Sequence, residues 1–206
     1  MVKLRLFPQE TAGLQALARM SEHILAGTQT LAELLGAGRG DFAALTESLR
    51  RHEAASTADF ATLLTNMRTS FINPLPREDM YALGQLLNET SEMLTGAGEV
   101  IELYTLDRIP TRVSDQLEIL SRQAELTAAA MKALNDLDSL EDYWLEVLRL
   151  SKRADHTHRV IVAELLDAHS PSTFAKYSNL AGQLAAASRQ MRMVATQVGS
   201  IIVKES

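Results

Sequence analysis

Long stretches of helical pattern, broken only by short segments rich in glycine or proline, constrain this chain more than any other feature of its sequence. The breaks include a Gly-Ala-Gly-Arg-Gly loop at 36–40 and two prolines within 74–76. Between the breaks, apolar residues recur at helical spacing, and strand-like alternation is absent over any useful length. The sequence therefore predicts an all-α protein of six long helices. Their approximate bounds are 11–35, 42–71, 78–104, 112–137, 140–169 and 173–203.

The composition excludes several classes of function. The 206 residues contain no cysteine, which excludes disulfides, cysteine-ligated iron–sulfur clusters and thiol catalysis. The formal net charge of -6 argues against a nucleic-acid partner, because phosphate backbones require a basic footprint. Neither a run of eighteen apolar residues nor a signal peptide is evident, so we expect a cytoplasmic protein. No catalytic sequence motif is present, and we expect no enzymatic activity.

Two prolines separate the second predicted helix from the third. Pro74 and Pro76 interrupt a helix and push the residue before each of them toward extended backbone. Arg77, Glu78 and Asp79 follow at the start of the next helical pattern, where carboxylates suit the positive end of the helix dipole. The segment therefore predicts a rigid elbow that leads into a helix with an acidic first turn.

This segment resembles a motif of the PhoU-like accessory proteins of Pit-type phosphate permeases, F-[IV]-T-P-x-[DE]-R-E-D-I. Similar stretches occur at 137–147, at 163–166 and at the C-terminus, so the resemblance spans most of the chain. Together with the element order, it implies one PhoU-like domain over 1–206. The domain would consist of two pseudo-repeated three-helix bundles, 1–107 and 108–206. The residues that match the first motif directly are Phe71, Ile72, Pro74, Arg77, Glu78 and Asp79.

The resemblance also implies metal sites, because the family holds multinuclear clusters, usually of iron, with E-x-x-x-D pairs. Residues four apart share a helix face, so facing pairs form an oxygen cage for cations. On the second helix the pair falls at Glu53 and Thr57, and on the third at Asn88 and Glu92, beside Glu89. A weakened iron or zinc site of Glu53, Asn88, Glu89 and Glu92 is one expectation. The alternatives are a neutralised glutamate at the edge of an apolar stripe and a solvated charged face.

The second implied site has lost almost all of its acids. Its pairs fall at Ser151 and Asp155 on the fifth helix and at Ala185 and Arg189 on the sixth, with Arg192 at a further acidic position of the family. Arginine would repel metal ions, so we expect no cluster there. We hypothesise instead that Arg189 or Arg192 occupies the place of the metal and pairs with Asp155. The alternative is that both arginines are exposed on the back of the helix.

The resemblance implies a cytoplasmic regulator that docks on the cytosolic face of a Pit-type phosphate permease and modulates phosphate uptake. Such a protein needs no active site and no cofactor, and it could lie peripherally at the inner face of the membrane. A metal-binding protein that keeps the weakened site is the first alternative. A homodimer that uses exposed methionines as an adaptable contact surface is the second. The methionines considered for this surface are Met80, Met93, Met131, Met191 and Met193.

Overall fold

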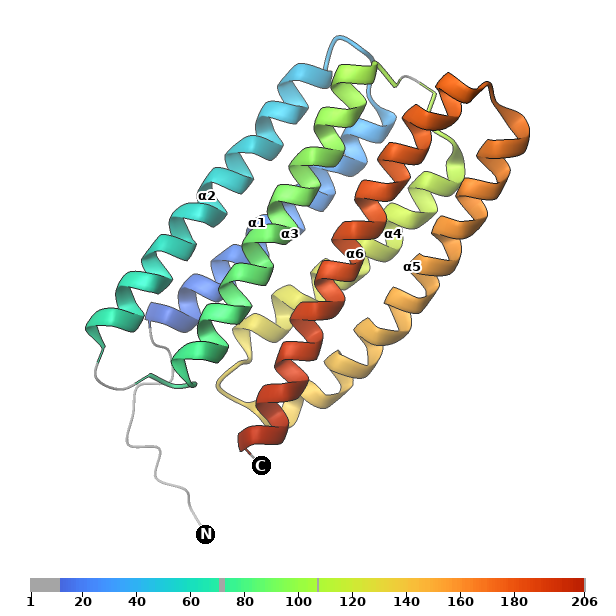
Figure 1. The fold of residues 1–206 in the computed structure, drawn as a ribbon. Helices are drawn as coiled ribbons and strands as arrows, with labels where there is room; N and C mark the ends of the chain where they lie inside the picture. The colour runs from blue at the N-terminus through green and yellow to red at the C-terminus, as the bar shows by residue number, and fades with distance from the viewer. Residues whose placement is uncertain (1–11, 71–72, 107, 206) are drawn as a thin grey trace.

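The computed structural model describes residues 12–70, 73–106 and 108–205, and within them the chain is a bundle of six long helices without strands (Figure 1). The prediction of an all-α protein with six long helices is confirmed. A single turn of 3-10 helix, η1, precedes the fifth helix. The elements are α1 (Ala12–Gly36), α2 (Phe42–Thr69), α3 (Arg77–Tyr104), α4 (Thr111–Lys132), η1 (Leu137–Leu140), α5 (Glu141–Ala168) and α6 (Pro171–Glu205).

One predicted boundary is wrong, because α4 ends at Lys132 and not near 137. The chain leaves the helix through two tight turns, in which the Ala133 amide donates to Ala130 and the Asp136 amide donates to Ala133. The Ser139 hydroxyl then donates to the Asp136 carbonyl at 2.7 Å. Short polar side chains compete locally for backbone hydrogen bonds, and here they replace the last helical turn with a turn and η1.

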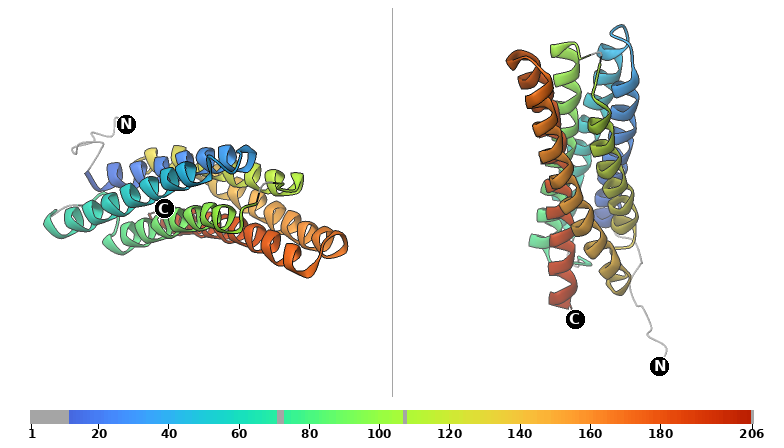
Figure 2. Two further views of the ribbon diagram at one scale, coloured as in Figure 1. Left: turned by 90° about the horizontal axis from the view of Figure 1, so that it is seen from above. Right: turned by 90° about the vertical axis from the view of Figure 1, so that its right-hand side faces the viewer.

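The helices form two curved layers (Figure 2). α1 packs against α2, α3 and α4, whereas α6 packs against α3, α4 and α5. α2 therefore lies at one flank and α5 at the other, while the α1–α4 and α3–α6 contacts join the first three helices to the last three. The two pseudo-repeated units, 1–107 and 108–206, stay a prediction.

A continuous apolar core runs between the layers and contains residues of all six helices. Small residues bring α2 and α3 close together: a β-carbon on Gly98 would lie 2.3 Å from Cδ1 of Leu49, and one on Gly84 would lie 2.6 Å from Cδ2 of Leu63. Most of the methionines considered for a dimer surface belong to the core. Met80, Met131 and Met191 are buried and Met93 is partly buried, so Met193 alone of the five is exposed.

The elbow between α2 and α3 is held at both ends. Pro76 caps α3, and Leu75, between the two prolines, is buried. The Arg77 guanidinium donates to the carbonyl of Ser70 at 2.9 Å, which ties the start of α3 back to the end of α2. Pro74 is exposed on the outside of this turn. Phe71, the first residue of the predicted motif, lies outside the described residues.

Within the described part of the chain, none of the helices is long and apolar enough to cross a membrane.

Candidate functional site

The first inferred metal position lies at the seam between α2 and α3, and polar side chains there bond to one another. Thr57 donates to the amide oxygen of Asn88 at 3.0 Å, and the amide nitrogen of Asn88 donates to Glu92 at 2.8 Å. Of the positions at which the resemblance implies acids on these two helices, Thr57 and Asn88 are the two where this chain has a neutral residue. A neutral hydroxyl–amide pair therefore joins the helices where two carboxylates would otherwise need a cation.

Glu89 points to a different helix. One of its carboxylate oxygens accepts from Gln85 at 2.9 Å, and the other accepts from the amide nitrogen of Gln190 on α6. Gln190 is buried, so this contact belongs to the interface between α3 and α6. Glu89 thus accepts from two amide donors at the α3–α6 interface, whereas Glu53 lies at the seam between α2 and α3.

Glu53 and Glu92 line a groove of about 420 Å³ between α2 and α3, together with Arg50 and Glu99. Glu53 is half-buried and Glu92 is exposed, as expected of a residue that points away from the apolar stripe of α3. Partial burial, and then the negative charges of Glu53 and Glu89, raise the pKa of the Glu92 carboxyl above its ordinary value. Like charges are therefore concentrated at this seam without full compensation.

Among the described residues, no three histidine, aspartate or glutamate side chains gather closely enough to hold a metal ion. Asn88 and the two-amide contact of Glu89 account for part of this, since they remove two oxygen ligands from the groove. The arrangement does not fit a multinuclear cluster, which needs several converging carboxylates. The weakened iron or zinc site of Glu53, Asn88, Glu89 and Glu92 stays a prediction.

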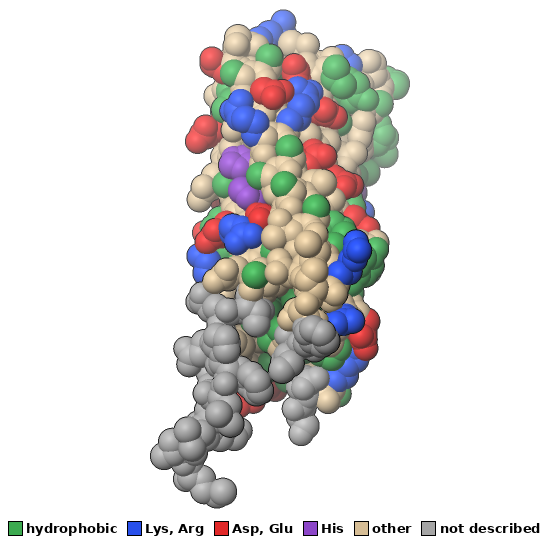
Figure 3. All heavy atoms as spheres, turned by 90° about the vertical axis from the view of Figure 1, so that its left-hand side faces the viewer, with side chains coloured by type: hydrophobic (Ala, Val, Ile, Leu, Met, Phe, Trp, Pro, Cys, Tyr) green, Lys and Arg blue, Asp and Glu red, His purple; other side chains and the backbone are tan. Residues whose placement is uncertain are grey.

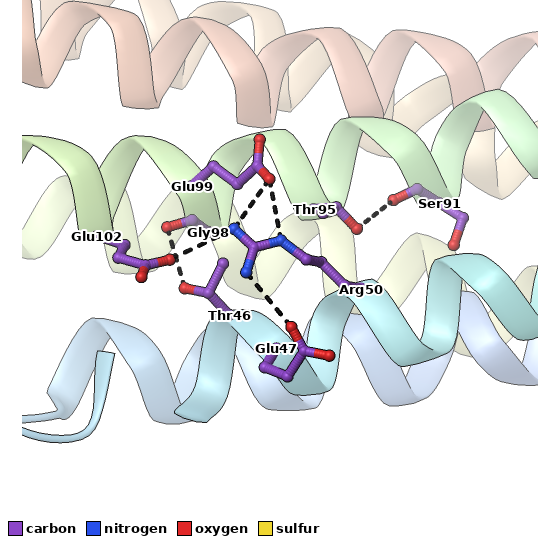
Figure 4. A network of polar contacts seen from close by, with 8 residues as sticks. All are labelled: Thr46, Glu47, Arg50, Ser91, Thr95, Gly98, Glu99 and Glu102. Atoms are coloured by element: carbon purple, nitrogen blue, oxygen red, sulfur yellow. Dashed lines mark hydrogen bonds and ion pairs between the residues drawn. The ribbon is translucent and has the colours of Figure 1, made fainter. Parts of the chain in front are cut away.

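Arg50 forms the centre of an ion-pair network at the same seam, which the sequence analysis missed (Figure 4). Its Nε and Nη2 atoms both donate to Glu99 at 3.1 Å, and the guanidinium also approaches Glu47 at 3.4 Å and Glu102 at 3.6 Å. The hydrogen bond to Glu99 is the main cause that raises the pKa of Arg50. In the sequence, the i,i+3 spacing of Glu47 and Arg50 could have indicated part of this network. Three carboxylates around one cation leave this surface acidic.

The second inferred position lies at the seam between α5 and α6. Arg189 approaches Asp155 at 3.7 Å, which is the pairing that the sequence analysis hypothesised. Both side chains are partly exposed. Arg192 is half-buried and forms no ion pair with the described residues, whereas Ser151 and Ala185 are fully buried. The Ser151 hydroxyl has no hydrogen-bond partner among the described residues.

His158 follows Asp155 by three residues and lies half-buried at this seam. Desolvation, and then the positive charge of Arg189, lower the pKa of its imidazole below the ordinary value. Its Nδ1 atom is buried without a hydrogen-bond partner in the described residues. The side chains at the α5–α6 seam are therefore mainly positively charged, whereas those at the α2–α3 seam are mainly negative. Arginines lie around the α5–α6 seam, and a single carboxylate faces them.

Asp79 has a role that its sequence context did not predict. It lies in the first turn of α3, as the sequence predicted, and it is only 2% exposed. Its Oδ1 atom accepts from Lys204 at 2.7 Å and from Gln197 at 2.8 Å, both near the end of α6. Glu78 beside it is exposed. The proline motif and the C-terminal motif, far apart in the sequence, therefore meet in one ionic contact between a buried carboxylate and a half-exposed lysine.

A row of polar side chains continues along α6 toward its other end. Gln183, Gln190, Gln197 and Lys204 recur every seven residues and face α3. The amide oxygen of Gln183 lies 3.6 Å from the position of a β-carbon on Gly96, Gln190 bonds to Glu89, and the last two bond to Asp79. We call these four residues the α6 polar row. Their seven-residue spacing is hard to recognise in the sequence, because many alanines lie between them.

The seam between α1 and α2 carries a pair of histidines. The rings of His23 and His52 lie 6.0 Å apart, and His23 Nε2 is 3.5 Å from Asp59, which also pairs with Arg19 at 2.7 Å. Figure 3 shows histidine side chains on this face among charged groups of both signs. Desolvation, and then the His23 and Arg51 charges, lower the pKa of His52.

Comparisons with known proteins address the fold. No family model matches the chain, and no curated protein does. Among solved structures, that of a PhoU-like protein from Shewanella oneidensis MR-1 matches with a TM-score of 0.73 and 12% identity, over 93% of this chain and 99% of that one. The chain has the fold of a PhoU-like protein. The fold implied by the sequence resemblance is thereby confirmed, and the association with Pit-type permeases stays a prediction.

Proposed function

We propose that this chain is a regulator of phosphate uptake that docks on the cytosolic face of a Pit-type permease, with the metal ligands of its family largely lost. The observation that carries the proposal is the PhoU-like fold over nearly the whole chain, combined with internal bonds at the former ligand positions. Thr57 bonds to Asn88, and Arg189 lies 3.7 Å from Asp155, so protein groups interact at both positions where the resemblance places metal ligands.

The proposed mechanism is surface docking, which requires neither catalysis nor a cofactor. Five carboxylates lie along the α2–α3 seam, where Arg50 offsets only part of their charge: Glu47, Glu53, Glu92, Glu99 and Glu102. Cytosolic loops of membrane proteins are enriched in lysine and arginine. The α2–α3 seam is therefore complementary in charge to the cytosolic side of a permease, and a cytoplasmic protein would approach the membrane through it.

Uptake of radiolabelled phosphate by cells that lack the gene tests this proposal. We expect altered uptake that is restored by the wild-type chain and restored less by a Glu47→Gln/Glu99→Gln variant, which weakens the acidic face. A Glu118→Gln/Glu125→Gln variant removes two exposed charges from α4 and is the matched control. Crosslinking in the same cells should join the chain to the permease. Unchanged uptake in the deletion strain, with no crosslink, would refute the proposal.

A residual metal site is a second candidate function, and the raised pKa of Glu92 favours it. The charges of Glu53 and Glu89 contribute to that shift, and a bound iron or zinc ion would relieve their repulsion. Elemental mass spectrometry on untagged protein, purified without chelator, measures the metal content. Metal that is lost in a Glu53→Gln/Glu92→Gln variant would support the site. Metal-free protein whose melting does not respond to added iron or zinc would exclude it.

A further inference from the structure

The register of α5 against α6 places two unpaired groups opposite each other. These helices run antiparallel and contact each other along the seam (Figure 1). A β-carbon on Gly199 would lie 3.0 Å from Trp144, and Asp155 meets Arg189 further along. In both contacts the two residue numbers have nearly the same sum, as expected of an antiparallel pair. The same register sets Ser151 opposite Arg192, one helical turn from the Asp155–Arg189 contact.

Hydrogen-bond donors at this seam outnumber acceptors. A guanidinium has five N–H donors, yet among the described residues Arg189 makes only the 3.7 Å approach to Asp155, which is too long for a hydrogen bond. Arg192 is half-buried and unpaired within the described residues. The Ser151 hydroxyl is fully buried and lacks a partner there as well. A buried donor without an acceptor is costly, so a group that supplied several oxygens would be stabilised at this seam.

The surrounding charge has the sign that such a group needs. Between 152 and 159, α5 has three basic residues and one acid, Asp155. Near this contact α6 contributes Arg189 and Arg192 and no acid, whereas Lys176 lies near the start of the helix and Lys204 at its end, where it pairs with Asp79. Arg159 and Arg189 both act on the imidazole of His158, so the two helices contribute their positive charge to one place. Arginine binds multi-oxygen anions through parallel hydrogen bonds, and phosphate groups fit its planar fork.

We propose that the α5–α6 seam binds a phosphate group, with the guanidinium groups of Arg189 and Arg192 and the Ser151 hydroxyl as donors. The phosphate group comes either from inorganic phosphate or from an anionic lipid headgroup, since both present the same oxygens. Asp155 holds Arg189 at the edge of the site and leaves most of its donors free. This site goes beyond docking on a permease and does not depend on it.

Binding is tested on the purified full-length chain with two ligands. In the first arm, thermal unfolding is followed in potassium phosphate and in potassium chloride of equal ionic strength. In the second arm, the chain is sedimented with vesicles of phosphatidylcholine alone or with phosphatidylglycerol added. We expect stabilisation by phosphate over chloride, or sedimentation that needs the anionic lipid, and the responding arm identifies the source of the phosphate group.

Variants connect the response to the seam. Arg189→Gln/Arg192→Gln should weaken the apparent affinity by about tenfold or more, as expected for the loss of charge-assisted hydrogen bonds. Arg112→Gln/Arg122→Gln removes two exposed arginines from α4 and should bind like the wild type. Ser151→Ala is an independent test of the site in case the double variant does not fold. Because its hydroxyl has no partner, Ser151→Ala should be at least as stable as the wild type and yet bind more weakly.

Two results would overturn the site. The first is the absence of any specific response to both phosphate and phosphatidylglycerol. The second is a response that the Ser151 and Arg189/Arg192 variants retain in full, or that the α4 control loses equally, because binding would then depend on net charge alone. Neither result bears on phosphate uptake in cells, so failure of this site is distinguishable from failure of the proposed regulation.

Discussion

The contact between Asp79 and Lys204 predicts an asymmetric response to mutation. The Asp79 side chain is 3% exposed, whereas that of Lys204 is 49% exposed. If Lys204 is replaced by methionine, the buried carboxylate keeps only Gln197 as a donor, and its Oδ2 atom has no partner in the described residues. If Asp79 is replaced by asparagine, the ammonium group of Lys204 can return to water. Lys204→Met should therefore cost more stability than Asp79→Asn.

The size of each effect follows from burial. A buried ion pair that loses one partner costs about 3–5 kcal/mol, and half-exposure of Lys204 reduces this to about 2–3 kcal/mol for Lys204→Met. Asp79→Asn keeps the shape and one acceptor, so we expect a loss of about 1 kcal/mol, typical of a weakened hydrogen bond. The double variant should lose less than the sum of the two, because Lys204→Met leaves no buried charge once Asp79 is neutral.

Urea unfolding followed by far-UV circular dichroism measures these differences, with Lys176→Met as the control. Lys176 is an exposed lysine near the start of the same helix. We expect the control to change the free energy of unfolding by less than about 0.5 kcal/mol. Equal losses for Lys204→Met and Asp79→Asn, or additive losses in the double variant, would refute the view that the buried carboxylate depends on its lysine.

Three further predictions follow from the packing, the elbow and the histidines. Gly98→Ala should lower stability by about 1–3 kcal/mol through overpacking. Gly182 has open space around it, so Gly182→Ala should raise stability slightly. Thermal unfolding of the two variants measures the difference. Alanine at both Pro74 and Pro76 should let α2 run on, with changed helicity and a lower melting temperature, and an unaltered spectrum and melt would argue against the elbow. Because the folded pKa of His158 is lowered, the neutral imidazole is favoured in the fold. Stability should hold above the unfolded pKa of about 6.5 and fall as pH drops below it, and His158→Gln should flatten that acid limb.

The fold was predictable because helix periodicity and helix breakers are local signals. Five of the six helices end within a few residues of their predicted bounds, and the 74–76 elbow lies where two prolines require it. α4 is the exception, since the turns at Ala133 and Asp136 are made by local backbone hydrogen bonds and one bond from the Ser139 hydroxyl, which periodicity does not report. The resemblance supplied what local signals could not, namely the PhoU-like fold.

The site residues were less predictable, because their partners are distant in sequence. The pairing of Asp155 with Arg189 could be hypothesised, since the loss of acids and the gain of arginines fall at one inferred position. The bonds of Asp79 to Lys204 and of Glu89 to Gln190 connect residues more than a hundred positions apart. Local sequence assigns both acids to a helix surface, and only the packing of α6 against α3 reveals that one of them is buried.

The α6 polar row has a consequence for how the first three helices are aligned with the last three. An interface of leucine and alanine would tolerate a shift of one helix along the other by a turn, about 5.4 Å, at modest cost. Here such a slide would carry Lys204 and Gln197 past Asp79 and separate Gln190 from Glu89, which would strand a buried carboxylate. The polar residues, which recur every seven positions along α6, therefore find their partners on α3 in only one register. A partner that pushed on the first three helices would therefore move the last three with them.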